Sequence, residues 1–309
     1  MAYAIDIARD ADPRREIRRI ALERIVSARK NLRKVTDGVD ERIHGIRRDL
    51  KKLRALIRLL RKPLGKSRFK QEDHAFRDAG RLLAPFRDAA ARVAVVEALR
   101  GKETGAISAS ALEAAHDEVR SLYRKTVRKD DVRKAAKGAD ALLEEAEKRL
   151  KDWELEESGF GLLREGLAVM YAHARTGLAR CLIHPTAPNF HDWRKCCKYL
   201  RYQIELLHPV SPREMKVAED TLHKLTDLLG NDHDLAVLGE TLESLSDGTL
   251  DDAELWAIHQ SFQSEHQRFM KGCWIKGRGF FTGNAGDFVK RIEGYWEAAT
   301  MGRMSGIDT

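Results

Sequence analysis

The stretch RIHGIRRDLKKLRALIRLLRK (42–62) decides the fold, because two side-chain patterns run through it at helical spacing. Its apolar residues recur every three or four positions, which places them along one face of an α-helix. They are Ile43, Ile46, Leu50, Leu53, Ile57 and Leu60. A basic row follows one position behind, about a quarter turn away, so that it lies at the edge of the buried face. It consists of His44, Arg47, Lys51, Arg54, Arg58 and Arg61.

A second stretch, FHDWRKCCKYLRYQIELLHPV (190–210), carries both patterns again, 147 residues later. Its apolar row is Phe190, Trp193, Cys197, Leu200, Ile204 and Leu207, and its polar row is His191, Arg194, Lys198, Arg201, Glu205 and His208. Four of the six polar positions are identical in the two stretches. A solvated helix face has no reason to repeat in this way, so the pattern indicates an internal duplication.

A further pair of similar segments supports the duplication. LLAPFRDAAARV (82–93) resembles LLGNDHDLAVL (228–238), at an offset of 146 residues. Asp88 then matches Asp234, and Arg87 matches His233. Two halves of this kind predict two four-helix bundles in tandem.

Helical periodicity extends over nearly the whole chain and predicts an all-α protein. The expected helices span residues 14–35, 40–61, 67–84, 86–100, 111–129, 131–152, 159–183, 188–208, 213–229, 232–247, 251–276 and 286–299. Proline and glycine mark the expected breaks, at Pro63-Leu64-Gly65, Pro185 with Pro188, Pro209 with Pro212, Gly230-Asn231, and Gly277 with Gly279. We expect one domain over residues 8–300, with a first bundle over about 8–150, a second over about 158–300, and a frayed tail at 301–309.

The composition agrees with a helical protein and suggests an anionic partner. Charged residues make up 34% of the chain and aromatic residues 7%, which favours helices over sheets. The net charge of +8 indicates either a polyanionic partner or simply a basic protein. We expect a soluble cytoplasmic protein, because neither a signal-peptide pattern nor an apolar run long enough for a membrane span is present. The four cysteines lack metal-ligand spacing, which predicts reduced thiols.

These motifs resemble those of the CHAD domain, the conserved histidine α-helical domain. Residues 42–62 are similar to the family's first His-x-x-Arg-x-x-x-Lys/Arg-x-x-Arg helix. Residues 190–210 are similar to its second, including the Lys-x-Leu-Arg-Tyr run at 198–202, and LLGNDHDLAVL is similar to the LLG…D motif that follows. The resemblance spans about residues 10–300, and it is specific because several motifs recur in the right order and at the right separation.

The resemblance implies a single helical domain of two pseudo-symmetric four-helix bundles, with basic residues of both bundles lining a central groove or pore. Members of the family bind inorganic polyphosphate and associate with polyphosphate granules, so we expect the same partner and location here. Some members carry a fused triphosphate-hydrolysing domain. The 309 residues leave no room for one, so we expect the domain to stand alone.

The motif positions carry over as candidate polyphosphate-binding residues. They are His44, Arg47, Lys51, Arg54 and Arg58 in the first half and His191, Arg194, Lys198 and Arg201 in the second, with Arg77 and Arg81 as weaker candidates on the next helix. Glu205 departs from the basic pattern, and an acidic residue there should repel phosphate. Arginine binds phosphate oxygens in pairs, lysine acts as a point charge, and histidine donates a hydrogen bond.

Other interpretations of individual residues are weaker. No carboxylate or cysteine stands at ligand spacing from His44, and Cys197, which with His191 and Cys196 suggests zinc, occupies the apolar row. Asn231-Asp232-His233-Asp234 looks like a hydrolase metal cluster, but we interpret Asn231 or Asp232 as the cap of a helix that begins after Gly230, with Asp234 in its first turn. We expect packing roles for Trp153, Trp193, Trp256, Trp274 and Trp296, and inert thiols at Cys181 and Cys273.

Three other functions compete with polyphosphate binding. A metal-dependent phosphohydrolase could use the histidines with Asp88, Asp232 or Asp234, but no acidic cluster lies within the basic rows to hold Mg²⁺. A non-specific nucleic-acid binder would suit the cations, but recognition signatures are missing and the rows contain few aromatic residues on which bases could stack. A scaffold with an accidental charge pattern is the third. We expect a non-catalytic protein without a cofactor or bound metal.

Overall fold

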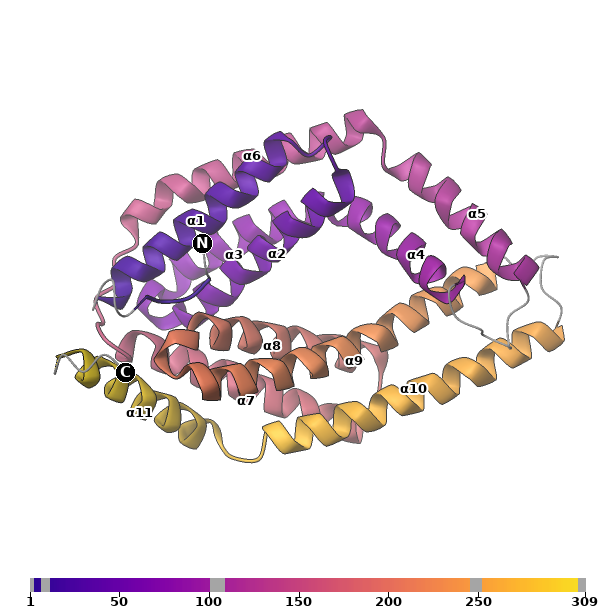
Figure 1. Ribbon diagram of the computed structural model, residues 1–309. Coiled ribbons are helices and arrows are strands. Elements are labelled where there is room, and N and C mark those ends of the chain that lie inside the picture. Colours follow the sequence, from indigo (N-terminus) through magenta and orange to yellow (C-terminus); the bar gives the residue numbers. More distant parts are fainter. Residues whose placement is uncertain (1–2, 7–11, 101–108, 245–251, 305–309) are drawn as a thin grey trace.

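A computed structural model of the chain shows an all-helical architecture (Figure 1). It describes residues 3–6, 12–100, 109–244 and 252–304, and in these ranges it contains eleven α-helices and no strand. The helices are α1 (Pro13–Arg33), α2 (Val39–Leu59), α3 (Arg61–Leu82), α4 (Ala84–Arg100), α5 (Ala109–Thr126), α6 (Lys129–Arg149), α7 (Gly161–Ile183), α8 (Ala187–Leu206), α9 (Pro212–Ser244), α10 (Asp252–Phe280) and α11 (Ala285–Met304). Two short 3-10 helices, Leu150–Asp152 and His208–Val210, follow α6 and α8.

The helices lie in two layers (Figure 1). In the first layer α1 packs on α2, α2 on α3, and α6 on both α1 and α3. In the second layer α7 packs on α8, α8 on α9, α9 on α10, and α11 on α7. The two basic stretches of the sequence form α2 and α8, and these helices contact one another where the layers meet. The helix pair α4 and α5 extends away from the first layer, and α4 reaches α9 of the second layer.

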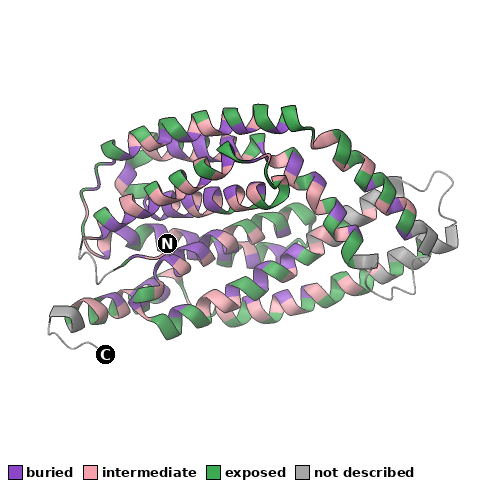
Figure 2. Cartoon of the chain, turned by 45° about the horizontal axis from the view of Figure 1, so that its top comes forward, coloured by how far each residue is buried: buried purple, intermediate pink, exposed green. Residues whose placement is uncertain are grey.

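Both apolar rows of the sequence are buried, as their spacing predicts. The six residues on α2 and just after it are at most 2% exposed, and the six on α8 and just after it are at most 6% exposed. Figure 2 shows the buried residues on the sides of the helices that face one another. They belong to one hydrophobic cluster that includes residues of both layers. Burial of these two stripes supplies the main driving force that packs the layers together.

Close contacts hold α2 against the second layer. A Cβ atom added at Gly166 of α7 would lie 2.0 Å from the carbonyl oxygen of Leu59, so the two backbones touch where glycine leaves room. The buried side-chain amide of Gln203 donates a hydrogen bond of 3.1 Å to the carbonyl oxygen of Ala55. These contacts fix the register in which the two basic helices face each other.

The expected helix break at Gly230-Asn231 is wrong. Helix α9 runs without interruption from Pro212 to Ser244, so neither Asn231 nor Asp232 caps a helix. Glycine inside a helix costs only about 1 kcal/mol and keeps its backbone N–H, so it does not force an end. In the first half Pro85 stands at the position that matches Asn231, and there one helix ends at Leu82 and the next begins at Ala84. The break at Pro63-Leu64-Gly65 is a kink inside α3, where Gly65 has φ 71° and ψ 161°.

The expected packing roles of the tryptophans are confirmed at four of the five positions. Trp153, Trp193 and Trp296 are buried, and Trp274 packs on the core with its ring 5.8 Å from that of Trp193. Trp256 is 67% exposed, so its expected packing role is wrong.

The four cysteines are free thiols. Burial raises the pKa of Cys181 to about 11 and that of Cys273 to about 12, which agrees with inert thiols at these two positions. None of the helices in the described ranges combines the length and the hydrophobicity that a membrane crossing needs.

Candidate anion-binding site

A cavity of about 530 Å³ opens between α2, α4, α8 and α9. Eight Lys and Arg side chains line it against two Asp side chains, so it concentrates positive charge from both halves of the chain. Six candidates from the sequence lie in this lining: Arg47, Lys51, Arg54, His191, Arg194 and Lys198. Two stretches 147 residues apart therefore converge on one space.

Arg47 and Arg194 are held in equivalent ways in the two halves. The Arg47 guanidinium donates a hydrogen bond of 2.7 Å to the carbonyl oxygen of Gly80, and the Arg194 guanidinium donates one of 3.4 Å to that of Thr226. Gly80 and Thr226 are 146 residues apart, the offset of the second repeated segment. Burial lowers the pKa of both arginines, but arginine keeps its proton in proteins.

Gly230 makes room for the Arg194 side chain. A Cβ atom added at Gly230 would lie 2.7 Å from a terminal nitrogen of that guanidinium. The glycine of the LLG motif is therefore a packing residue inside α9, not a helix terminator. Its effect is to let the guanidinium of α8 lie against the neighbouring helix.

The two aspartates in the lining face the arginines of their own halves. The charge of Asp88 counteracts the lowering of the Arg47 pKa by burial, and Asp234 does the same for Arg194. Asp88 and Asp234, which align in the repeated segments, thus both line the cavity. Each half contributes one arginine, one lysine and one aspartate from equivalent positions.

The lysines Lys51 and Lys198 are half-buried and crowded by cations. Burial, and then the charges of Arg47, Arg194, Arg87 and Arg201, together lower the pKa of Lys51 to about 8. Burial and the charges of Arg194, Lys51 and Arg201 lower the pKa of Lys198 to about 7. Within the part of the chain that the structure describes, neither ammonium group has a carboxylate at ion-pair distance. A polyanion entering the cavity would supply the missing negative charge.

Arg54 and Arg58 already share a carboxylate. Both donate to the same oxygen of Asp73 on α3, each at 2.8 Å. Burial raises the pKa of Asp73, but these hydrogen bonds outweigh it and leave the pKa lowered. The Arg58 guanidinium carbon also lies 4.3 Å from the centre of the Tyr199 ring. Arg54 lines the cavity and Arg58 does not, so this end of the basic row is partly neutralised.

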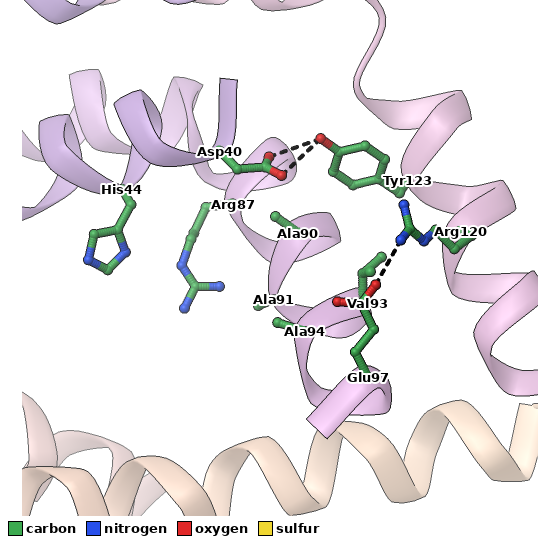
Figure 3. A pocket seen from close by; sticks show the side chains of 10 residues that line it. All are labelled: Asp40, His44, Arg87, Ala90, Ala91, Val93, Ala94, Glu97, Arg120 and Tyr123. Carbon is green, nitrogen blue, oxygen red and sulfur yellow. Dashed lines mark hydrogen bonds and ion pairs between the residues drawn. The ribbon is translucent and has the colours of Figure 1, made fainter. Parts of the chain in front are cut away.

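His44 lies at a second cavity of about 480 Å³ that adjoins the first, since Arg87 and Ala91 line both. Figure 3 shows the His44 imidazole and the Arg87 guanidinium pointing into the same open space. Partial burial, then the charges of Arg87, Arg48, Lys51 and Lys198, lower the pKa of His44. Near neutral pH the imidazole is therefore uncharged and can offer a hydrogen bond but not a full charge.

Polar pairs occupy the far side of this second cavity. The Tyr123 hydroxyl donates to both oxygens of Asp40 at 3.0 Å, and the Arg120 guanidinium donates to Glu97 at 2.8 Å (Figure 3). These pairs tie α5 to α2 and to α4. The Arg120 charge is thus paired, and the cation of this cavity without an ion pair among the described residues is Arg87, which also lines the first cavity.

The remaining candidates lie at or beyond the edge of the first cavity. The Arg201 guanidinium carbon lies 4.8 Å from the centre of the Tyr202 ring, close enough to the lysines to lower their pKa values but outside the lining. Arg77 and Arg81 pair with Asp78 on the same helix and are outside the lining.

Glu205, the departure from the basic pattern, accepts an ion pair of 2.6 Å from Lys52 of α2. This acidic residue therefore links the two layers.

The comparison with family models matches residues 19–243 to the CHAD domain. This chain belongs to the CHAD domain family. Among solved structures it is similar to the CHAD domain of the plant Ricinus communis, with 18% identity, 92% of this chain and 90% of that chain covered, and a TM-score of 0.56. At that identity the likeness concerns the fold alone. The comparison with curated proteins found no match.

Three cationic residues of the CHAD domain cavity were not predicted from the sequence. They are Arg87 and Arg92 on α4 and Lys195 on α8. Arg87 lies in the repeated segment 82–93 and aligns with His233 of the second segment, so the repeat could have indicated it. Arg92 and Lys195 are exposed and carry no signal in the repeat.

Potential metal ligands come together elsewhere in this CHAD domain. Among the described residues, Glu113, His116 and Asp117 on α5 form such a group, and none of them lines the basic cavity. Arg120 donates to the His116 imidazole at 3.4 Å, which places a cation beside these ligands. Neither His191 with the adjacent cysteines nor the aspartates of the cavity form a group of this kind in the described ranges.

Proposed function

We propose that this CHAD domain binds inorganic polyphosphate in the cavity between α2, α4, α8 and α9. The observation that carries the proposal is the convergence of equivalent cations from both halves on one space: Arg47 with Arg194, and Lys51 with Lys198. A linear polyanion with no bases can be recognised only by charge and spacing, and the lining offers both. Repeated arginine and lysine positions supply paired hydrogen bonds and point charges to successive phosphates.

We further propose that the two layers are tandem, pseudo-symmetric bundles with the ligand between them. The equivalent hydrogen bonds of Arg47 to Gly80 and of Arg194 to Thr226 support this proposal. The pairing of Asp88 with Asp234 around the cavity supports it as well. One ligand would then contact both repeats at the same time.

The aromatic residues of the lining favour polyphosphate over single-stranded nucleic acid. Binding of unpaired bases usually needs exposed rings on which the bases stack. Tyr199 and Tyr202 are at most 6% exposed, and the guanidinium groups of Arg58 and Arg201 lie over their rings. These two rings are therefore not accessible for stacking with a nucleic-acid base.

CHAD domains are generally binding domains without catalytic activity, and the cavity suits that role. Phosphoryl transfer usually needs carboxylates free to hold a divalent cation. Asp88 and Asp234 instead face Arg47 and Arg194, whose charges would oppose a cation at the same place. We therefore propose binding without hydrolysis, and association with polyphosphate granules as its consequence in the cytoplasm.

Titration with long-chain polyphosphate, and with duplex DNA matched in phosphate content, tests the proposal. At about 0.15 M salt we expect a clear preference for polyphosphate and an affinity that falls steeply with added salt. Lys51→Gln should weaken binding. Lys216→Gln is the matched control, because Lys216 lies outside the cavity lining and pairs with Asp220. Equal binding of DNA, or unchanged binding by a folded Lys51→Gln variant, would overturn the proposal.

Phosphate release in the presence of Mg²⁺ tests the non-catalytic part. We expect none above background from any polyphosphate chain length. Release that disappears in the Asp88→Asn variant would instead assign the cavity to a phosphohydrolase.

A further inference from the structure

Two lysines, one from each repeat, share the basic cavity, and among the residues that the structure describes neither has a carboxylate at ion-pair distance. Lys51 on α2 and Lys198 on α8 occupy equivalent positions, line the same space and are both half-buried. Lys51 is close enough to lower the pKa of Lys198. An ammonium group in such a place keeps its charge only at a cost in free energy, because it loses water and gains no anion.

The groups around the lysines come from four helices. On α2 and α8 they are Arg47, Arg194 and Arg201, and α4 adds Arg87 next to Asp88. On α9, Asp227 acts against the lowering of the Lys198 pKa, and Asp234 faces Arg194. His44 and His191 also lie at the two cavities. The first cavity is lined in addition by Arg54, Arg92, Lys195, Tyr199 and Tyr202, and the second by Asp40, Glu97, Arg120 and Tyr123.

Lys51 and Lys198 are the lysines of this lining whose pKa is lowered to near neutral pH. The arginines keep their protons, and the pKa of the His44 imidazole is lowered by partial burial and by neighbouring cations. Burial and the neighbouring arginines bring the pKa of Lys51 to about 8 and that of Lys198 to about 7. Without a ligand, Lys51 and Lys198 therefore carry only part of their positive charge near neutral pH.

We propose that filling this cavity with a polyanion is coupled to proton uptake by Lys51 and Lys198, so that the ligand recharges the site that binds it. The proposal rests on the proposed function and adds a form of regulation to it. Phosphate oxygens beside each ammonium group stabilise its charged form, and the complex then holds more protons than the free protein. By linkage the affinity must fall as the pH rises through the range in which the free lysines lose their protons.

Calorimetric titration with long-chain polyphosphate measures the uptake directly. The experiment uses two buffers of different ionisation enthalpy near pH 8, where the buffer supplies any proton that the complex takes up. We expect about one proton per bound site, and an affinity at least about tenfold lower at pH 9 than at pH 7. Long chains have few terminal groups, so the ligand itself contributes little proton exchange.

The double variant Lys51→Arg/Lys198→Arg is the matched control, because it keeps both charges but removes the ability to lose them. It should bind polyphosphate, show no buffer-dependent heat near pH 8, and lose the affinity difference between pH 7 and pH 9. The single variant Lys198→Arg should lose part of both effects, and serves if the double variant does not fold.

Two results would overturn the proposal in distinguishable ways. Polyphosphate binding by the native protein with no buffer-dependent heat, or equal proton uptake by the native protein and a folded arginine variant, would contradict the proton coupling alone. Absence of polyphosphate binding at every pH would contradict the proposed function, and the coupling with it.

Discussion

Arg87 brings a charge from outside the two repeated helices into the site. It lines both cavities, lowers the pKa of His44 and of Lys51, and forms no ion pair within the part of the chain that the structure describes. Its guanidinium is therefore available to a ligand. A contact to phosphate from such a group contributes about 1.5–3 kcal/mol.

We predict that Arg87→Ala lowers the affinity for polyphosphate by about tenfold or more and reduces the salt dependence by about one charge. Titrations at several salt concentrations measure both quantities. Arg81→Ala is the control, because Arg81 is exposed, pairs with Asp78 and does not line the cavity. Equal losses in the two variants would mean that only the overall charge matters, which contradicts a defined site.

We expect Lys198 to lower the stability of the ligand-free protein while it contributes to polyphosphate binding. Its folded pKa is about 7, against an ordinary value of 10.5, so between these values the unfolded chain holds more protons. Stability therefore rises with pH across this window, and the cost of the buried charge is fully present below it. We predict that Lys198→Met raises the free energy of unfolding by about 1–3 kcal/mol near pH 6 and by less near pH 10, while it weakens polyphosphate binding.

Denaturant unfolding at the two pH values checks this prediction. Lys195→Met is the neighbouring control, because Lys195 is exposed and pairs with Asp192, so its replacement should change stability by no more than about 0.5 kcal/mol. A Lys198→Met protein that is less stable than the native protein near pH 6 would contradict the account of the buried charge.

Residues on the two repeated helices could be predicted because helical spacing fixes the direction of each side chain. Six of them line the cavity. The sharing of Asp73 by Arg54 and Arg58 could not be predicted, since it depends on the register of α3 against α2. The spacing of residues along α2 does not indicate how α3 is positioned against it.

At the scale of the elements, proline and glycine had different consequences in the repeated segment, where Pro85 matches Asn231 and Ala84 matches Gly230. Pro85 removes a backbone donor and separates α3 from α4, whereas Gly230 is accommodated inside the longer α9. The sequence predicted both as breaks, because the contact between Gly230 and the Arg194 guanidinium is a tertiary one.

We predict that Gly230→Ala keeps or raises the stability of the protein, by up to about 1 kcal/mol, but lowers its affinity for polyphosphate. The new methyl group would displace the flexible end of Arg194 from its place. A double-mutant cycle with Arg194→Ala tests the route, because Gly230→Ala should have no further effect on affinity once that guanidinium is gone. An equal loss of affinity in both backgrounds would exclude Arg194 as the cause.

The contact between α7 and α2 should tolerate no added carbon. We predict that Gly166→Ala destabilises the protein by about 3 kcal/mol, because its Cβ would meet backbone atoms of Leu59 that cannot turn away. Gly45→Ala on α2 is the control, since nothing lies within 4 Å of its added Cβ, and it should be neutral or stabilising. Thermal unfolding compares the two variants. Native-like unfolding of Gly166→Ala would show that the layers are not in backbone contact there.

At the scale of the whole molecule, the reach of α4 across to α9 completes the cavity and was not predictable from the sequence. Periodicity indicates which face of a helix is buried but not where the helix points after a break. The fold class and the family followed from the repeat, and the contribution of α4 to the site required the structure. The net charge of +8 acquires its meaning from this placement, since cations of α2, α4 and α8 meet in one space.

We propose that one polyphosphate chain contacts both repeats at once. The most direct test measures the affinity and stoichiometry of polyphosphate binding for Lys51→Glu and for Lys198→Glu, with Lys216→Glu as the control. We predict that either cavity variant alone lowers the affinity at a single class of site by about tenfold or more, and that the control binds like the native protein. If each variant instead lost half of the binding sites and kept native affinity at the other half, the two repeats would bind polyphosphate independently. That result would contradict a shared site.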